Sequence, residues 1–186
     1  MSAEYSPQLE PAQKADWFGG FLEGAGSIGY YYRPSDNRAY PQIQYKSQDI
    51  DPLLFLQNVF GGSISILERS NNWGTNGQLA HDILVAISSY APSKKHFSTL
   101  AATWNDYTIE EKIAVIQKIR ELDTPFPHKD EYVPLVRNKQ FLAGLFDARA
   151  ALTIAGKLRL SCPNQPLLEA LQELYKDQGL TPEVVD

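Results

Sequence analysis

One short segment of this sequence has an excess of positive charge. Residues 27–48 contain Arg33, Arg38 and Lys46 against a single acid, Asp36. Lys and Arg bind nucleic-acid phosphates, because neutralising a phosphate releases its condensed counterions. The chain as a whole carries a net charge of −5, which argues against binding driven mainly by non-specific charge. The acidic balance does not exclude a local basic face formed by this segment.

The histidines and the cysteine of the sequence do not form a pattern typical of metal binding or nucleophilic catalysis. The three histidines, His81, His96 and His128, are too scattered to predict a metal site or a catalytic triad. The single cysteine, Cys162, excludes an internal disulfide, argues against a structural zinc site and fits a small apolar core position. We therefore expect no cofactor.

The hydropathy of the chain predicts a globular protein without a membrane partner. No apolar run approaches the roughly 18 residues of a membrane span. Residues 1–17 show neither the regions of a signal peptide nor the Arg-rich character of a transit peptide. The sequence leaves the compartment open, with an organelle such as the mitochondrion or chloroplast among the candidates.

The elements that must position the basic segment follow an α-β-β-α order. Residues 13–24 predict a helix whose small residues allow another backbone to approach closely. Residues 27–33 and 40–48 predict two strands joined by a turn, and alternation places Gln42, Gln44 and Lys46 on one side of the second strand. We then expect a helix at 50–60, strands at 63–68 and 81–88 joined by the polar loop 70–78, and helices at 92–104 and 108–122.

After a proline-containing linker the pattern restarts. A helix is expected at 135–150, short strands at 152–155 and 157–161 around a turn at Ala155-Gly156, and a helix at 166–178. This is an internal repeat with a shorter second copy. The expected organisation is a flexible N-terminal arm at 1–12, a first repeat at 13–123, a linker at 124–134 and a truncated second repeat at 135–186.

The two repeated helices resemble the LAGLIDADG signature of homing endonucleases. They read FGGFLEGAG from Phe18 to Gly26 and LAGLFDARA from Leu142 to Ala150, and the second matches the signature at its first seven positions except for one Ile-to-Phe change. The resemblance implies an α+β fold of αββαββα repeats with curved antiparallel sheets, the second repeat being truncated. It also implies that the motif helices pack through small residues, here Gly19, Gly20, Ala143 and Gly144.

The sequence departs from the family at the positions that bind metal. In the family each motif helix ends in an acid that holds a divalent ion for phosphodiester hydrolysis, but these positions are Ala25 and Arg149 here. Alanine offers no ligand atom, and arginine places a permanent cation there. From this departure we expect no metal and a degenerate member of the family that is not an enzyme. Glu23 and Asp147 match an earlier acidic position, which in the family supports the helix end.

The resemblance also assigns the long first hairpin to nucleic-acid binding, because family members read DNA with β-ribbons in the major groove. The contacts expected on this hairpin are Tyr31, Arg33, Arg38, Gln42, Gln44 and Lys46. In the Tyr30-Tyr31-Tyr32 run, the exposed ring could stack on unpaired RNA bases. Trp73, in the expected polar loop, could anchor a partner or pack back on the domain.

Three functions are compatible with these features. The first is an inactive domain reused to bind nucleic acid, RNA more than DNA, within a ribonucleoprotein such as an organellar ribosome. The second is an assembly subunit that docks on proteins without contacting nucleic acid. The third is an active magnesium-dependent endonuclease that builds its site from Glu23 and Asp147 or from a partner chain.

Overall fold

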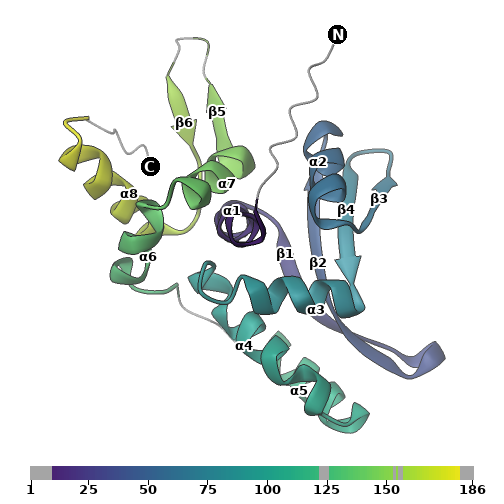
Figure 1. The fold of residues 1–186 in the computed structure, drawn as a ribbon. Coiled ribbons are helices and arrows are strands. Elements are labelled where there is room, and N and C mark those ends of the chain that lie inside the picture. Colours follow the sequence, from purple (N-terminus) through teal and green to yellow (C-terminus); the bar gives the residue numbers. More distant parts are fainter. Residues whose placement is uncertain (1–9, 122–125, 153, 155–156, 181–186) are drawn as a thin grey trace.

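The computed structural model describes residues 10–121, 126–152, 154 and 157–180 (Figure 1). The first helix, α1 (Pro11–Gly24), begins with proline at its first position, where the missing N–H has no intrahelical partner to lose. The helix ends at Ala25, which is extended, and Gly26 follows with a φ of +88°. That φ lies in the left-handed region, which glycine adopts without a steric penalty, and it turns the chain from α1 into the first strand.

Four antiparallel strands form the larger sheet, in the order β1 (Ser27–Arg33), β2 (Arg38–Ser47), β4 (Asn71–Asn76) and β3 (Ser63–Ile66). A short 3-10 turn, Pro34–Asp36, joins β1 to β2 and ends at Asn37 with a φ of 52°. Asparagine tolerates this left-handed conformation better than most residues. The resulting hairpin reaches past the helices, at the lower right of Figure 1. The strand pair predicted from alternation is therefore confirmed.

Helices from both halves of the chain complete the fold. Those that follow the first hairpin are α2 (Asp51–Phe60), α3 (Gly77–Ala86), α4 (Lys95–Thr103) and α5 (Ile109–Arg120). The second half contains α6 (Lys129–Val136), α7 (Lys139–Arg149), a two-stranded sheet of β5 (Ala150–Leu152) and β6 (Leu158–Leu160), and α8 (Gln165–Asp177). The expected turn at Ala155-Gly156 lies outside the described residues.

The prediction for residues 70–88 was wrong. The expected polar loop is strand β4, and the expected strand at 81–88 belongs mostly to helix α3. In β4 only Trp73 and Thr75 are buried, so the strand's alternation is visible only as two buried side chains between polar ones. In α3 the buried residues Ala80 and Leu84 are four positions apart, the spacing of one helix face.

The stretch expected as a linker also holds structure. Helix α6 runs through its second half and continues to Val136, with Tyr132 and Val136 buried. The single helix expected at 135–150 is divided, because α7 begins anew after Asn138, whose side chain accepts hydrogen bonds from the backbone N–H groups of Gln140 and Phe141. An asparagine at this position satisfies N–H groups that have no partner within the helix.

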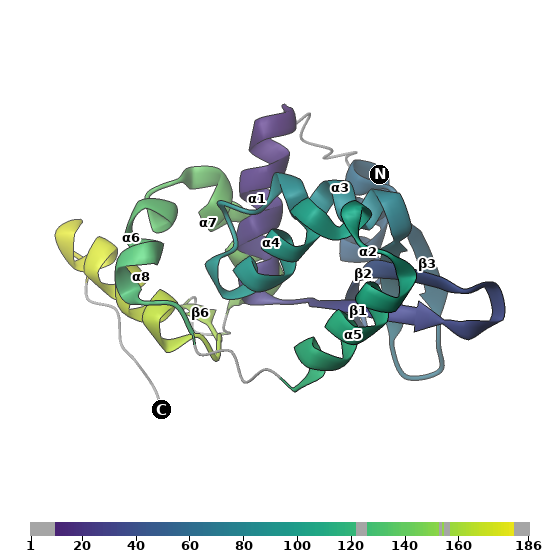
Figure 2. The ribbon, with the colours of Figure 1, turned by 90° about the horizontal axis from the view of Figure 1, so that it is seen from below.

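Helices α1 and α7 pack against each other in the middle of the molecule, with the four-stranded sheet on one side and α6 and α8 on the other (Figure 2). Gly20 and Gly144 lie in this contact, where each leaves no room for a side chain. Gly24 lies in it as well, against Ala148 and Arg149. Gly19, which we expected there, instead faces Tyr90, and Ala143 is exposed at the edge of the contact.

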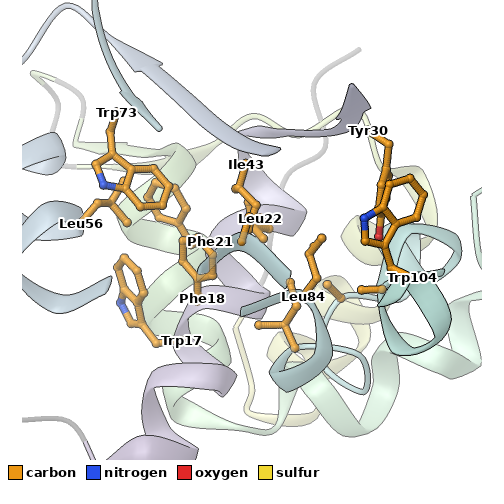
Figure 3. Close-up of a cluster of buried hydrophobic side chains, with 14 of the residues drawn as sticks. Trp17, Phe18, Phe21, Leu22, Tyr30, Ile43, Leu56, Trp73, Leu84 and Trp104 are labelled. Carbon is orange, nitrogen blue, oxygen red and sulfur yellow. The ribbon is translucent and has the colours of Figure 1, made fainter. Parts of the chain in front are cut away.

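The main core lies between α1 and the sheet (Figure 3). Phe18 and Phe21 are at most 2% exposed and approach Trp73, whose ring lies edge-on to that of Phe18. A second cluster surrounds Phe141 and Leu145 of α7 together with Leu167 of α8. Within the described residues, no helix is both long and apolar enough to span a membrane.

Candidate nucleic-acid interface

The two faces of the four-stranded sheet differ completely in chemistry. Residues paired across the strands share a face, and Ile28, Ile43 and Thr75 are linked in this way on the side that packs under the helices. The opposite side, which we call the open face, carries no buried side chain. It consists of Ser27, Gly29, Tyr31, Arg33, Arg38, Tyr40, Gln42, Gln44, Lys46, Ser63, Ser65, Asn72, Gly74 and Asn76.

The structure brings all six expected contact residues together on this open face. Arg38, Gln42, Gln44 and Lys46 alternate along β2, and Tyr31 and Arg33 stand beside them on β1. The open face contains no Asp or Glu, although the chain as a whole is acidic. The result is a face of hydroxyl, amide and cationic groups that can donate to phosphates and bond to base edges.

Other residues of the open face were missed from the sequence. They are Ser27, Tyr40, Ser63, Ser65, Asn72 and Asn76. Those on β3 and β4 were missed because β4 was expected to be a loop. The signal that could have found β4 is the alternation of Trp73 and Thr75 with small or polar residues.

Aromatic and charged side chains at the hairpin end are held by local contacts. The ring of Tyr31 lies against Gly29, where a side chain would displace it. Arg33 Nε donates to Asp36 Oδ1 at 2.8 Å, and its guanidinium lies 5.7 Å from the centre of the Tyr40 ring. This hydrogen bond lowers the pKa of the Asp36 carboxyl. Arg38, whose side chain is 75% exposed, lies 3.7 Å from the same carboxylate.

The other members of the aromatic run and Trp73 are structural. The hydroxyl of Tyr30 donates to the carbonyl of Phe97 at 2.8 Å, and that of Tyr32 donates to Asn37 Oδ1 at 2.9 Å. Trp73 is fully buried and donates to the carbonyl of Gly61 at 2.8 Å. The sequence left two interpretations of Trp73. The structure confirms the one in which this side chain packs back on the domain.

A pocket of about 370 Å³ lies where the two motif helices end beside β2. It is lined by Ala25, Gly26, Ser27, Gln44, Tyr45, Lys46, Ala148 and Arg149, and we call it the helix-end pocket. Arg149 Nε donates to the carbonyl of Gly24 at the C-terminal end of α1, where a cation is favoured.

The helix-end pocket does not fit a divalent metal ion. Magnesium prefers hard oxygen ligands such as carboxylates, whereas this pocket presents the cations Lys46 and Arg149 and no acid. In the described part of the chain, no three His, Cys, Asp or Glu residues are grouped to hold a metal. The pocket has the chemistry of an anion site instead.

The two remaining acids of the motif helices do not line this pocket and have other partners. Glu23 is 5% exposed and accepts from Ser93 N at 2.8 Å, Tyr132 OH at 3.1 Å and Asn164 Nδ2 at 3.0 Å. Burial raises the pKa of the Glu23 carboxyl, although these hydrogen bonds oppose the shift. Asp147 accepts from Trp17 Nε1 at 2.9 Å, and burial raises its pKa as well.

The chain is similar in sequence to an RNA maturase. No protein-family model matches it. It is 25% identical over 101 residues to the intron-encoded RNA maturase bI4 of Saccharomyces cerevisiae, a match that covers 52% of this chain. The match spans only 16% of the length of that curated relative.

Comparison with solved structures identifies proteins of the same fold. The LAGLIDADG meganuclease I-AabMI bound to uncleaved DNA aligns with a TM-score of 0.56 and 13% identity, over 90% of this chain and 73% of that one. The LAGLIDADG homing endonuclease I-GzeII in complex with its DNA target aligns with a TM-score of 0.54 and 16% identity, over 87% and 71%. The α+β fold predicted from the sequence is thereby confirmed.

These comparisons correct the expectation that this chain is not an enzyme. The similar proteins are homing endonucleases on DNA and an RNA maturase, and nothing in the described residues demonstrates a loss of activity. The expectation was wrong because it rested on Ala25 and Arg149. These two positions bear on only one way of binding a metal ion.

Proposed function

We propose that this chain, which has the LAGLIDADG homing endonuclease fold, binds RNA on its open face and acts in RNA processing as a maturase-type factor. The observation that carries the proposal is the open face itself, which has three cations, several amides and no acid on a protein of net charge −5. Cations without an acid make this face electropositive, which suits the binding of an anionic polymer.

The side chains of the open face suit RNA in particular. Amides and hydroxyls can pair with base edges and 2′-hydroxyl groups, and the exposed ring of Tyr31 can stack on an unpaired base. The strands of the second sheet are three residues long, so the described residues offer one extended reading face. A single face suits binding to the local shape of an RNA. The similarity to an RNA maturase also supports RNA binding.

The helix-end pocket extends this face. Lys46 belongs to both, and Arg149, at the end of α7, also lines the pocket. Two cations that line a cavity without acids can hold a backbone phosphate. We therefore place one phosphate of the bound RNA in the helix-end pocket.

Matched triple variants test the proposal. Arg38→Ala, Gln44→Ala and Lys46→Ala together should weaken binding of an RNA hairpin about tenfold or more in a fluorescence anisotropy titration, since two phosphate contacts and an amide are lost. The control removes the same residue types from the exposed surface of α5, with Gln117→Ala, Lys118→Ala and Arg120→Ala. Equal affinities of the two triple variants would refute RNA binding by the open face.

A second candidate function is magnesium-dependent cleavage of DNA. The observation that favours it is the fold, which this chain shares with homing endonucleases on DNA. A nicking assay on supercoiled DNA with and without magnesium tests it, with Glu23→Gln and Asp147→Asn as variants that remove the remaining motif acids. Magnesium-dependent cutting lost in these folded variants would establish the nuclease function, and no cutting by the native chain would refute it for these substrates.

A further inference from the structure

A second cavity, of about 460 Å³, lies at the far end of the β1–β2 hairpin, and we call it the hairpin-edge pocket. Strand β4 pairs with β2 only over Gln42–Ser47. Within the described residues, Arg38–Pro41 pair with β1 on one side but have no strand on the other, and these residues line the pocket. The start of α3 and one side of α5 form the opposite walls.

The lining of the hairpin-edge pocket combines apolar and polar side chains. Trp104, Pro41 and Ile109 supply apolar surface, and Gln78 and Asn105 supply amides. Arg38 and Lys112 add positive charge, and no Asp or Glu is part of the lining. Its volume falls within the ~300–1,000 Å³ of small-molecule sites, in which placed polar groups fix the orientation of the ligand.

A hydrogen-bond chain fixes the orientation of the two amides. Asp82 can only accept, so it receives Gln78 Nε2–H at 2.7 Å and His81 Nδ1–H at 3.0 Å. In the tautomer that carries its proton on Nδ1, His81 presents Nε2 as an acceptor, and Asn105 Nδ2 lies 3.4 Å from it. One N–H of each NH2 group is thus engaged, and the carbonyl oxygens of Gln78 and Asn105 remain as acceptors for a ligand.

We infer that the hairpin-edge pocket binds one unpaired nucleotide of the RNA on the open face and prefers a base with an exocyclic amino group. This inference rests on the proposed function. Arg38 and Asn76 line the pocket and also belong to the open face, so an RNA strand can pass from one to the other. The carbonyl oxygens of Gln78 and Asn105 accept from the amino group of cytosine or adenine, whereas uracil has none. Arg38 and Lys112 hold the adjoining phosphates.

Three RNA hairpins that differ at one position test the inference. One stem is fully paired, one carries a single bulged cytidine, and one carries a bulged uridine at the same place. We expect the cytidine bulge to bind about tenfold more tightly than the paired stem, the change that 1.4 kcal/mol produces, with the uridine bulge between them. Equal affinity for the three RNAs would overturn the inference.

Two pocket variants and a matched control localise the effect. Asn105→Ala and, separately, Gln78→Ala should each remove the preference for cytidine over uridine while affinity for the paired stem persists. Asn58→Ala, an exposed asparagine on α2 outside the pocket, should keep the preference. A preference that survives both pocket variants, whose fold is checked by circular dichroism, would also overturn the inference.

Titration with cytidine monophosphate separates this inference from the proposed function. NMR shifts at Gln78 and Asn105 on adding the mononucleotide, even if no RNA hairpin binds, would support the pocket and refute the wider proposal. RNA binding without a bulge preference and without these shifts would leave the proposed function standing and refute the pocket.

Discussion

Gly20 and Gly144 occupy equivalent places on opposite sides of the contact between α1 and α7. A side chain on Gly20 would overlap the carbonyl oxygen of Phe141, and one on Gly144 would overlap the carbonyl oxygen of Trp17. Both obstacles are backbone atoms, which cannot rotate away. The contact that places the helix-end pocket therefore depends on the absence of a Cβ at two positions.

Replacing either glycine by alanine should destabilise the protein. We expect Gly20→Ala and Gly144→Ala each to lower the free energy of unfolding by about 1–3 kcal/mol or more, as overpacking does. Urea denaturation followed by circular dichroism measures this. Gly74→Ala is the control, because a Cβ there meets its nearest atom at an ordinary 3.5 Å. Native-like stability of both helix variants would contradict the close contact.

The buried carboxyl of Glu23 should make stability depend on pH. Burial raises its folded pKa above the ordinary 4.5. As the pH rises past 4.5, the unfolded chain releases this proton while the folded protein keeps it, so the free energy of unfolding falls until the folded carboxyl also ionises. Glu23→Gln should make this fall smaller in urea titrations from pH 4.5 upward, whereas exposed Glu68→Gln should retain it in full. Parallel pH profiles for the two variants would exclude a raised pKa.

The hydrogen bond from Trp17 should control the ionisation of Asp147. Burial raises the pKa of Asp147, and the indole N–H opposes that shift because it stabilises the charged carboxylate. Trp17→Phe should therefore raise the pKa of Asp147 further, as followed by NMR titration of its carboxyl carbon. Trp104→Phe, in a different part of the core, should leave it unchanged. A lowered pKa in Trp17→Phe would show that the indole does not stabilise the carboxylate.

A single cation on the open face should account for about one phosphate contact. Lys46→Ala is expected to reduce the slope of log affinity against log salt by about 0.7–0.9, the value for one neutralised phosphate. Anisotropy titrations of an RNA hairpin at several salt concentrations give this slope. Lys118→Ala on α5 changes net charge equally and should leave the slope as it was. An unaltered slope in Lys46→Ala would exclude a phosphate beside this residue.

The sequence predicted those parts of the fold whose signals are local. Strand β1 was expected with the same bounds that the structure shows, because the run of tyrosines and the turn at Pro34 are both short-range features. The small residues of the motif helices predicted a close helix contact, and the structure shows one at Gly20 and Gly144. The position of Gly19 differed from the prediction because a pair of adjacent glycines does not show which of the two faces the partner helix.

The features that could not be predicted depend on tertiary contacts. Strand β4 is polar at every position except Trp73 and Gly74, so it becomes a strand through pairing with β2 and β3. Two of the hydrogen-bond partners of Glu23, Tyr132 and Asn164, are more than 100 positions away. The hairpin-edge pocket likewise depends on where β4 stops pairing, which no local pattern encodes.

Photo-cross-linking of an RNA hairpin that contains 4-thiouridine tests RNA binding by the open face most directly. Peptides cross-linked to the native protein are identified by mass spectrometry. We predict cross-links at Tyr31 and Tyr40, the two tyrosines of the open face. Cross-links confined to α5 or α8, with none on β1 or β2, would contradict the account.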